Sequence, residues 1–121
     1  MTAITSNDTP VAVEGEGVEL RLGEIGGDMS VAFIRLREGM DMTPALRGLP
    51  GDMCQARHWG YVFKGRVKIH TEHGAEIYEA GQAFYWPPGH VPEALEDCEF
   101  MDFSPTAEFD KVIEHIRSQA A

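Results

Sequence analysis

The chain has 121 residues, a hydrophobic share of 43% and a charged share of 25%, which suits one soluble globular domain with a single core. Its formal net charge of −10 repels phosphate backbones and anionic lipids, so we expect neither nucleic acid nor a membrane as a partner. The sequence starts without a basic segment or a long apolar run, and its two cysteines are typical of free thiols or ligands. These features predict a cytoplasmic protein.

The first half of the chain predicts an arm, two strands and a loop. Residues 1–15 are polar and show no clear period, so we interpret them as an N-terminal arm. Apolar and polar residues alternate from Val18, which predicts a strand, and residues 29–39 predict a second strand with apolar side chains on both faces. Residues 39–53 are rich in glycine and proline and are interpreted as a loop or lid.

The second half predicts further short strands and a terminal helix. The strands are expected at 54–63, 66–71, 76–79, 82–86 and 99–103. Ser104 can cap a helix with Pro105 in its first turn, and apolar residues then recur at helical spacing at Phe109, Val112, Ile113 and Ile116. We therefore predict an all-β sandwich or barrel over residues 16–104, with an amphipathic helix over 105–121 that packs on its outside.

Two glycine-punctuated blocks carry possible metal ligands at one end of a predicted strand. Cys54 and His58 precede the segment YVFKGRVKI, and the segment GQAFYWPPGH ends in His90. These blocks resemble the two conserved motifs of the cupin superfamily. The spacing of the second motif is met by Gly81, Pro87 and Gly89. The resemblance implies a double-stranded β-helix, or jelly-roll barrel, that forms homodimers and holds a metal or a small molecule in its mouth.

The metal-ligand positions of the first cupin motif are altered in this chain. If Gly65 is the closing glycine of that motif, His58 stands in the place of the family's glutamate. Cys54 then stands in the place of the second histidine, and Asp52 in the place of the first. Residues 52, 54 and 58 share one face of an unbroken strand, because side chains alternate between the two faces.

The second motif is altered as well. Its histidine would fall at Pro92, whereas the chain has a histidine two residues earlier, at His90, and Glu96 takes the place of the asparagine. His90 and position 92 are two residues apart, so their side chains would lie on the same face of a strand. His90 can therefore reach the same mouth from a neighbouring strand. We therefore predict that Cys54, His58 and His90 converge as metal ligands. Thiolate and imidazole suit zinc, and imidazole also suits iron or nickel.

Each of these ligands also has an interpretation without a metal. Cys54 can be a small buried apolar residue, as free cysteine usually is. His58 can be a core histidine bonded to a backbone carbonyl, and His90 an exposed residue of a turn. His70 and His73 flank a predicted turn and are interpreted as surface residues.

An aromatic row on the predicted strand 54–63 points to an interface. If His58 faces inward, Trp59, Tyr61 and Phe63 face outward. Burying such a side chain is worth roughly 1.5–3 kcal/mol, so either the terminal helix or a second subunit should cover the row. We favour a homodimer, because aromatic residues are enriched in interface cores.

Three functions remain open from the sequence. The first is a metal-dependent enzyme acting on a small molecule, with oxygenase, isomerase and decarboxylase chemistry all compatible with the ligand set. Its catalytic acid or base is not assigned, and Glu93 is the nearest candidate to the mouth. The second is a non-catalytic module that holds a small ligand or a zinc ion and acts as a sensor. The third is a barrel that serves only as a dimerisation scaffold.

Overall fold

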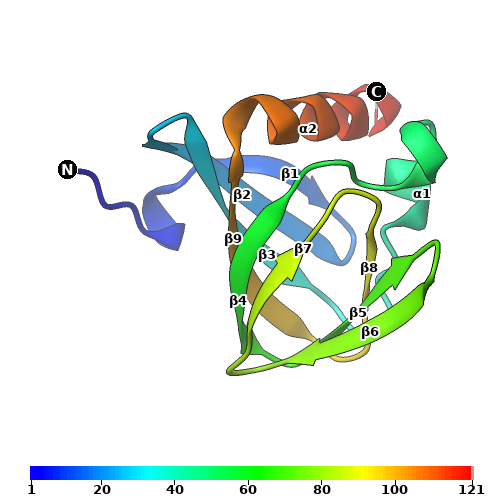
Figure 1. Cartoon of the computed structure of the whole chain (residues 1–121). Helices are drawn as coiled ribbons and strands as arrows, with labels where there is room; N and C mark the ends of the chain where they lie inside the picture. Colours follow the sequence, from blue (N-terminus) through cyan, green and yellow to red (C-terminus); the bar gives the residue numbers. More distant parts are fainter. Residues whose placement is uncertain (121) are drawn as a thin grey trace.

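The computed structural model describes residues 1–120, and they form two antiparallel sheets that enclose one core (Figure 1). The larger sheet has the strand order β1-β2-β3-β9-β4-β7, and the smaller sheet the order β6-β5-β8. The strands are β1 (Val11–Gly15), β2 (Val18–Gly26), β3 (Met29–Leu36), β4 (His58–Lys64), β5 (Arg66–Thr71), β6 (Gly74–Glu79), β7 (Ala83–Trp86), β8 (Val91–Ala94) and β9 (Cys98–Pro105). Two α-helices accompany them, α1 (Thr43–Leu46) and α2 (Thr106–Ala120).

The structure confirms an all-β jelly-roll barrel with a C-terminal helix and differs from the sequence prediction in several bounds. The strand β1 occupies Val11–Gly15, inside the range predicted as an arm. The predicted loop 39–53 contains α1 and a 3-10 turn at Pro50–Asp52. Strand β8 was not predicted, because its sequence VPEA contains a proline and a glutamate and is only four residues long.

Helix α2 closes one end of the barrel. Its apolar residues Phe109, Val112, Ile113 and Ile116 are buried in the same core as the inward side chains of the strands. The helix therefore lies across the end at which β4 begins, and not along the outer wall as predicted (Figure 1). Helical spacing identifies the apolar face of a helix but not the surface that this face will cover. Within residues 1–120, no helix is long and apolar enough to cross a membrane.

Polar contacts fix both ends of α2. Near its start, the Arg57 guanidinium donates to the Glu108 carboxylate at 2.6 Å, and the hydroxyls of Ser30 and Thr106 share a hydrogen bond of 2.8 Å. Near its end, Arg117 Nε donates to the carbonyl of Ala12 at 2.9 Å. These contacts hold the helix over the barrel end, so whatever lies beneath it is shielded from solvent.

Candidate metal centre

The backbone brings two of the three predicted ligands side by side. Cys54 N–H donates to the His90 carbonyl at 2.9 Å, and Gly89 N–H donates to the Cys54 carbonyl at 2.8 Å. His58 begins β4 and pairs with Trp86 at the end of β7, four residues before His90. All three side chains therefore start from the same end of the barrel.

The three ligand atoms lie close enough to share one ion. One atom each from Cys54, His58 and His90 lies within 4.8 Å of the others. Cys54 Sγ is 3.5 Å from His58 Nε2, and the two imidazole centroids are 4.9 Å apart. The exposed fractions of the three residues are 4%, 4% and 1%. The structure thus brings together the residues that the sequence singled out, at the end of the barrel that α2 covers.

Hydrogen bonds on the far side of each imidazole leave Nε2 free to bind a metal. His90 Nδ1 lies 2.7 Å from the Pro87 carbonyl oxygen, which only accepts, so Nδ1 carries the proton. His58 Nδ1 lies 2.5 Å from Ser104 Oγ and 3.4 Å from Asp102 Oδ1. His90 therefore presents a lone pair on Nε2, and His58 has a polar partner on Nδ1 as well, which is the arrangement of outer partners found at metal-binding histidines.

Burial keeps the three ligands neutral before a metal binds. It lowers the pKa of His58 well below 6.5, and the neighbouring His90 lowers it further. Burial also lowers the pKa of His90, against the opposing effect of the Pro87 carbonyl. The pKa of the Cys54 thiol rises to about 12, again because of burial. Neutral imidazoles are the form that binds metals, whereas the thiol must lose its proton on binding.

A buried carboxylate beside His58 suits a cation at this end of the barrel. Asp102 is 1% exposed, and its Oδ1 has no hydrogen-bond partner. Burial raises the pKa of Asp102 to about 8, while the Ser104 hydroxyl opposes the rise. Among residues 1–120, no lysine or arginine side chain pairs with it, and its one ionic contact is with His58. A cation held by the three ligands would favour the ionised form of this carboxyl, so the residues present fit a bound metal.

Sequence reasoning missed Asp102 and Ser104, although a signal existed. Both residues alternate with Met101 and Phe103 along β9, so they share the inward face with Phe100. A carboxylate at an inward position of a buried strand is rare unless it is paired. That anomaly, in a strand predicted only from its apolar residues, marks a candidate site residue.

The chamber beside the ligands is small and mostly apolar. Its volume is about 50 Å³, and α2 contributes Phe109, Val112 and Ile116 to its wall. The ring of Phe109 contacts His58 edge-on, with centroids 4.9 Å apart. Such a volume holds an ion and a few waters. It is far below the roughly 300–1,000 Å³ of pockets that bind organic ligands.

The structure differs from two of the metal-free interpretations. His58 is a core histidine, but its partner is not the one expected. The partner of His58 Nδ1 is the hydroxyl of Ser104, and not a backbone carbonyl. His90 is buried and not an exposed turn residue, because Trp86 and His58 pack against its ring. Cys54 does behave as a small buried residue, and its thiol faces His58 Nε2.

The remaining acidic candidates lie outside the chamber. Asp52 follows Gly51 in a 3-10 turn with a φ of 58°, is exposed, and accepts a hydrogen bond from Gly48 N–H. The predicted strand does not extend back to it, because β4 begins only at His58. Glu93 pairs with His70 at 2.8 Å, and His73 is exposed, as predicted.

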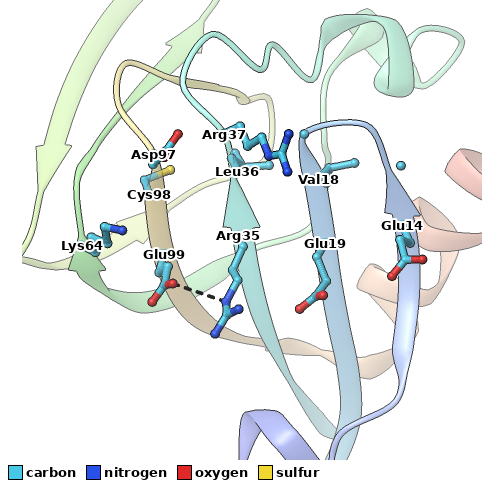
Figure 2. Close-up of a pocket in the computed structure, with 12 residues that line it drawn as sticks. Glu14, Val18, Glu19, Arg35, Leu36, Arg37, Lys64, Asp97, Cys98 and Glu99 are labelled. Carbon is cyan, nitrogen blue, oxygen red and sulfur yellow. Dashed lines mark ion pairs between the residues drawn. The ribbon is translucent and has the colours of Figure 1, made fainter.

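A larger surface cavity lies away from the ligand triad (Figure 2). Its volume is about 400 Å³, and it reaches Lys64, at the opposite end of β4 from His58. Side chains of both signs line it, including the ion pair between Arg35 and Glu99 at 3.4 Å. Its one thiol is Cys98, which is buried, with a pKa raised to about 11 mainly by that burial. This cavity offers no set of metal ligands.

Comparison with protein-family models and with curated proteins finds no match. Solved structures do match. An RmlC-like cupin from Shewanella frigidimarina aligns with a TM-score of 0.60 at 16% identity, over 84% of this chain and 88% of that one. The polyketide cyclase RemF from Streptomyces resistomycificus aligns with a TM-score of 0.63 at 16% identity, over 88% and 80%.

Oxalate decarboxylase from Bacillus subtilis also aligns, with a TM-score of 0.66 at 19% identity over 87% of this chain. The alignment spans only 29% of that enzyme, so this chain corresponds to a minor part of it. At these identities the likeness concerns the fold alone. Together with the two antiparallel sheets and their strand order, it shows that this chain has the cupin fold.

Proposed function

We propose that this protein binds one divalent metal ion through Cys54 Sγ, His58 Nε2 and His90 Nε2. The observation that supports this most strongly is the convergence of three buried donor atoms within 4.8 Å. A thiolate with two imidazoles suits zinc best, and iron or nickel remain compatible. The buried carboxyl of Asp102 lies beside His58, on its Nδ1 side, and this acidic group further favours a cation in the chamber.

The small chamber favours a non-catalytic metal-binding module over an enzyme. Helix α2 covers the ligands, and the space beside them, about 50 Å³, excludes an organic substrate. In such a module the ion joins the loop before β4 to the loop after β7, so metal binding stabilises the fold directly. The protein would act as a metal-dependent structural or sensing domain.

Metal-dependent catalysis is the second candidate, and two observations favour it. Three protein ligands leave a fourth position open, as in catalytic zinc sites. A second cavity, of about 320 Å³ between β6 and the end of β7, touches both Trp86 and His90. A metal ion held by the three ligands, beside this cavity, would act as a Lewis acid or activate water. Turnover by fully metal-loaded protein separates this candidate from the first.

Metal content and metal-dependent stability test the proposal. We expect tag-free protein to carry, or take up from a zinc buffer, one zinc ion per chain by elemental analysis. Because the ion binds only the folded chain, a hundredfold excess over its Kd should stabilise the fold by about 2.7 kcal/mol. A chelator should reverse the resulting rise in Tm. Wild-type protein that takes up no zinc and shows no change in Tm would contradict the proposal.

We also propose a homodimer formed by the outer aromatic face of the larger sheet. Trp59 is 40% exposed, Tyr61 41% and Phe63 52%, and Tyr85 and Phe103 lie beside Trp59 on neighbouring strands. Helix α2 does not cover this row, because its apolar residues pack over the barrel end. An interface between two copies is therefore the remaining way to shield these rings.

Replacing Tyr61 with glutamate should convert the dimer into a monomer, because the new charge lies at the centre of the aromatic face. Light scattering at micromolar concentration measures the change. The matched control is Ile77→Glu, which alters an apolar residue of β6 that is 52% exposed on the smaller sheet. It should leave the dimer intact. A monomeric wild type would exclude this interface.

The small-molecule ligand and the cytoplasmic location stay predictions. A small ligand has room in the cavity of about 320 Å³ between β6 and β7. Both cysteines are free and buried, which is in keeping with a reducing compartment.

A further inference from the structure

We propose that Asp102 and Ser104 position His58 for metal binding, and that the charge of Asp102 makes the site selective for divalent over monovalent ions. The inference rests on the metal-binding function proposed above. It assigns roles to two residues outside the set of three ligands.

The positioning role follows from the geometry around His58 Nδ1. Asp102 and Ser104 lie two residues apart on β9, so both side chains point to the inner face next to β4. Ser104 Oγ is 2.5 Å from Nδ1, and Asp102 Oδ1 is 3.4 Å from it. When the Ser104 hydroxyl donates to Asp102, its oxygen is left to accept from His58 Nδ1–H, so the pair favours the tautomer with a proton on Nδ1 and a lone pair on Nε2. Without the pair, His58 could adopt the other tautomer, in which Nε2 carries the proton and its N–H faces Cys54.

The selectivity follows from the charges that the chamber would hold. Once a cation is bound, it favours the ionised form of Asp102, so the Cys54 thiolate and the Asp102 carboxylate each contribute one negative charge, and both histidines are neutral ligands. The sum is minus two, so a divalent ion neutralises the chamber and a monovalent ion leaves one negative charge. An uncompensated charge is costly in a site as buried as this one, where Asp102 is 1% exposed.

The ligand atoms alone do not make this distinction. Thiolate and imidazole bind Cu⁺ as well as Zn²⁺, and soft thiolates select Cu⁺ in many proteins. The charge of Asp102 acts through space, and Coulomb energy is proportional to the charge of the ion. Its contribution to the logarithm of the affinity should therefore be twice as large for Zn²⁺ as for Cu⁺.

The variant Asp102→Asn tests the charge, because it keeps the size and an accepting oxygen. We expect it to weaken Zn²⁺ binding by about 10–100-fold, the usual effect of removing an outer-shell partner. Cu⁺ binding should weaken by only the square root of that factor, about 3–10-fold. Competition against chromophoric chelators at one fixed pH above the Asp102 pKa of about 8, where the carboxyl is ionised in the free protein, measures both affinities, with the Cu⁺ titrations done anaerobically under reductant.

Two further variants separate charge from structure. Ser104→Ala removes a hydrogen bond to His58 but no charge, so it should weaken both ions by the same factor. Asp110→Asn makes the same chemical change at an exposed position of α2, and it should alter neither affinity by more than about twofold, because surface charges are screened. If Asp102→Asn weakened the affinities for Zn²⁺ and Cu⁺ by the same factor, the proposed role of the Asp102 charge would be overturned.

The result also distinguishes failure of this inference from failure of the proposed function. A wild type that binds neither ion refutes the metal site itself. A wild type that binds Zn²⁺, with unchanged affinity in Asp102→Asn, refutes only the role of Asp102. Should the variant not fold, the ¹⁵N shifts of histidine in the wild type decide the positioning role. We expect His58 to carry its proton on Nδ1, and a proton on Nε2 would overturn the inference.

Discussion

Replacing His58 with alanine is expected to lower bound zinc from one ion per chain to less than about a tenth of an ion. Structural zinc sites contribute on the order of 10–16 kcal/mol, so the loss of one ligand in three removes several kcal/mol of binding. The barrel should stay folded, because no strand pairing depends on the imidazole. Elemental analysis after gel filtration measures the metal, and circular dichroism the fold.

The matched control for this experiment is His70→Ala. His70 lies on β5 and pairs with Glu93 at the surface, so its removal should leave the zinc content at one ion per chain. The His58→Ala variant should also lose the rise in Tm that zinc gives to the wild type, whereas His70→Ala should keep it, since that rise requires binding to the folded chain. Full zinc occupancy in His58→Ala would remove His58 from the ligand set.

The substitution Gly60→Ala is expected to destabilise the fold by about 3 kcal/mol or more, a large share of the roughly 5–15 kcal/mol by which such domains are stable. A Cβ at Gly60 would lie 2.1 Å from the Met101 carbonyl oxygen, 2.4 Å from the Phe84 ring and 2.8 Å from Asp102 Cβ. The carbonyl belongs to the ladder between β4 and β9, so it cannot move aside without breaking strand pairing. Urea unfolding followed by fluorescence measures the loss.

Gly15→Ala serves as the control, since it adds the same methyl group to another strand glycine. The nearest atom to a Cβ there is Val18 Cγ1 at 3.5 Å, an ordinary contact distance. Its backbone is not in the left-handed region, so the change should be neutral or stabilise by a few tenths of a kcal/mol. Similar midpoints for both variants would show that the close approach at Gly60 is not real.

The sequence predicted the convergence of the ligands better than their surroundings. His90 does lie beside Cys54, although it stands two residues before the family position, because the two residues pair in an isolated bridge between the loops before β4 and after β7. The parity argument failed for Asp52, because a left-handed residue in a turn breaks the strand on which parity relies. Local rules hold within an element and say nothing about where the element begins.

Long-range features could not be predicted, for a different reason. The helical period of α2 identified Phe109 and its neighbours as an apolar face, yet nothing local states that this face covers the metal chamber. The contact between Ser104 and His58 joins residues 46 positions apart, on strands that the sequence does not show to be adjacent. Such contacts depend on the strand order of the sheet, which apolar patterns leave undetermined.

The position of α2 has a consequence for the rate at which metal would exchange. The helix covers the chamber, and Arg57, Glu108 and Arg117 fasten both of its ends, so an ion would leave on this side only when the helix lifts. Residence time would then be set by a local opening of the fold, and not by the lifetime of the bonds between metal and ligands. Such a protein would keep its bound ion through a brief shortage of metal and would respond only to lasting changes in the metal concentration.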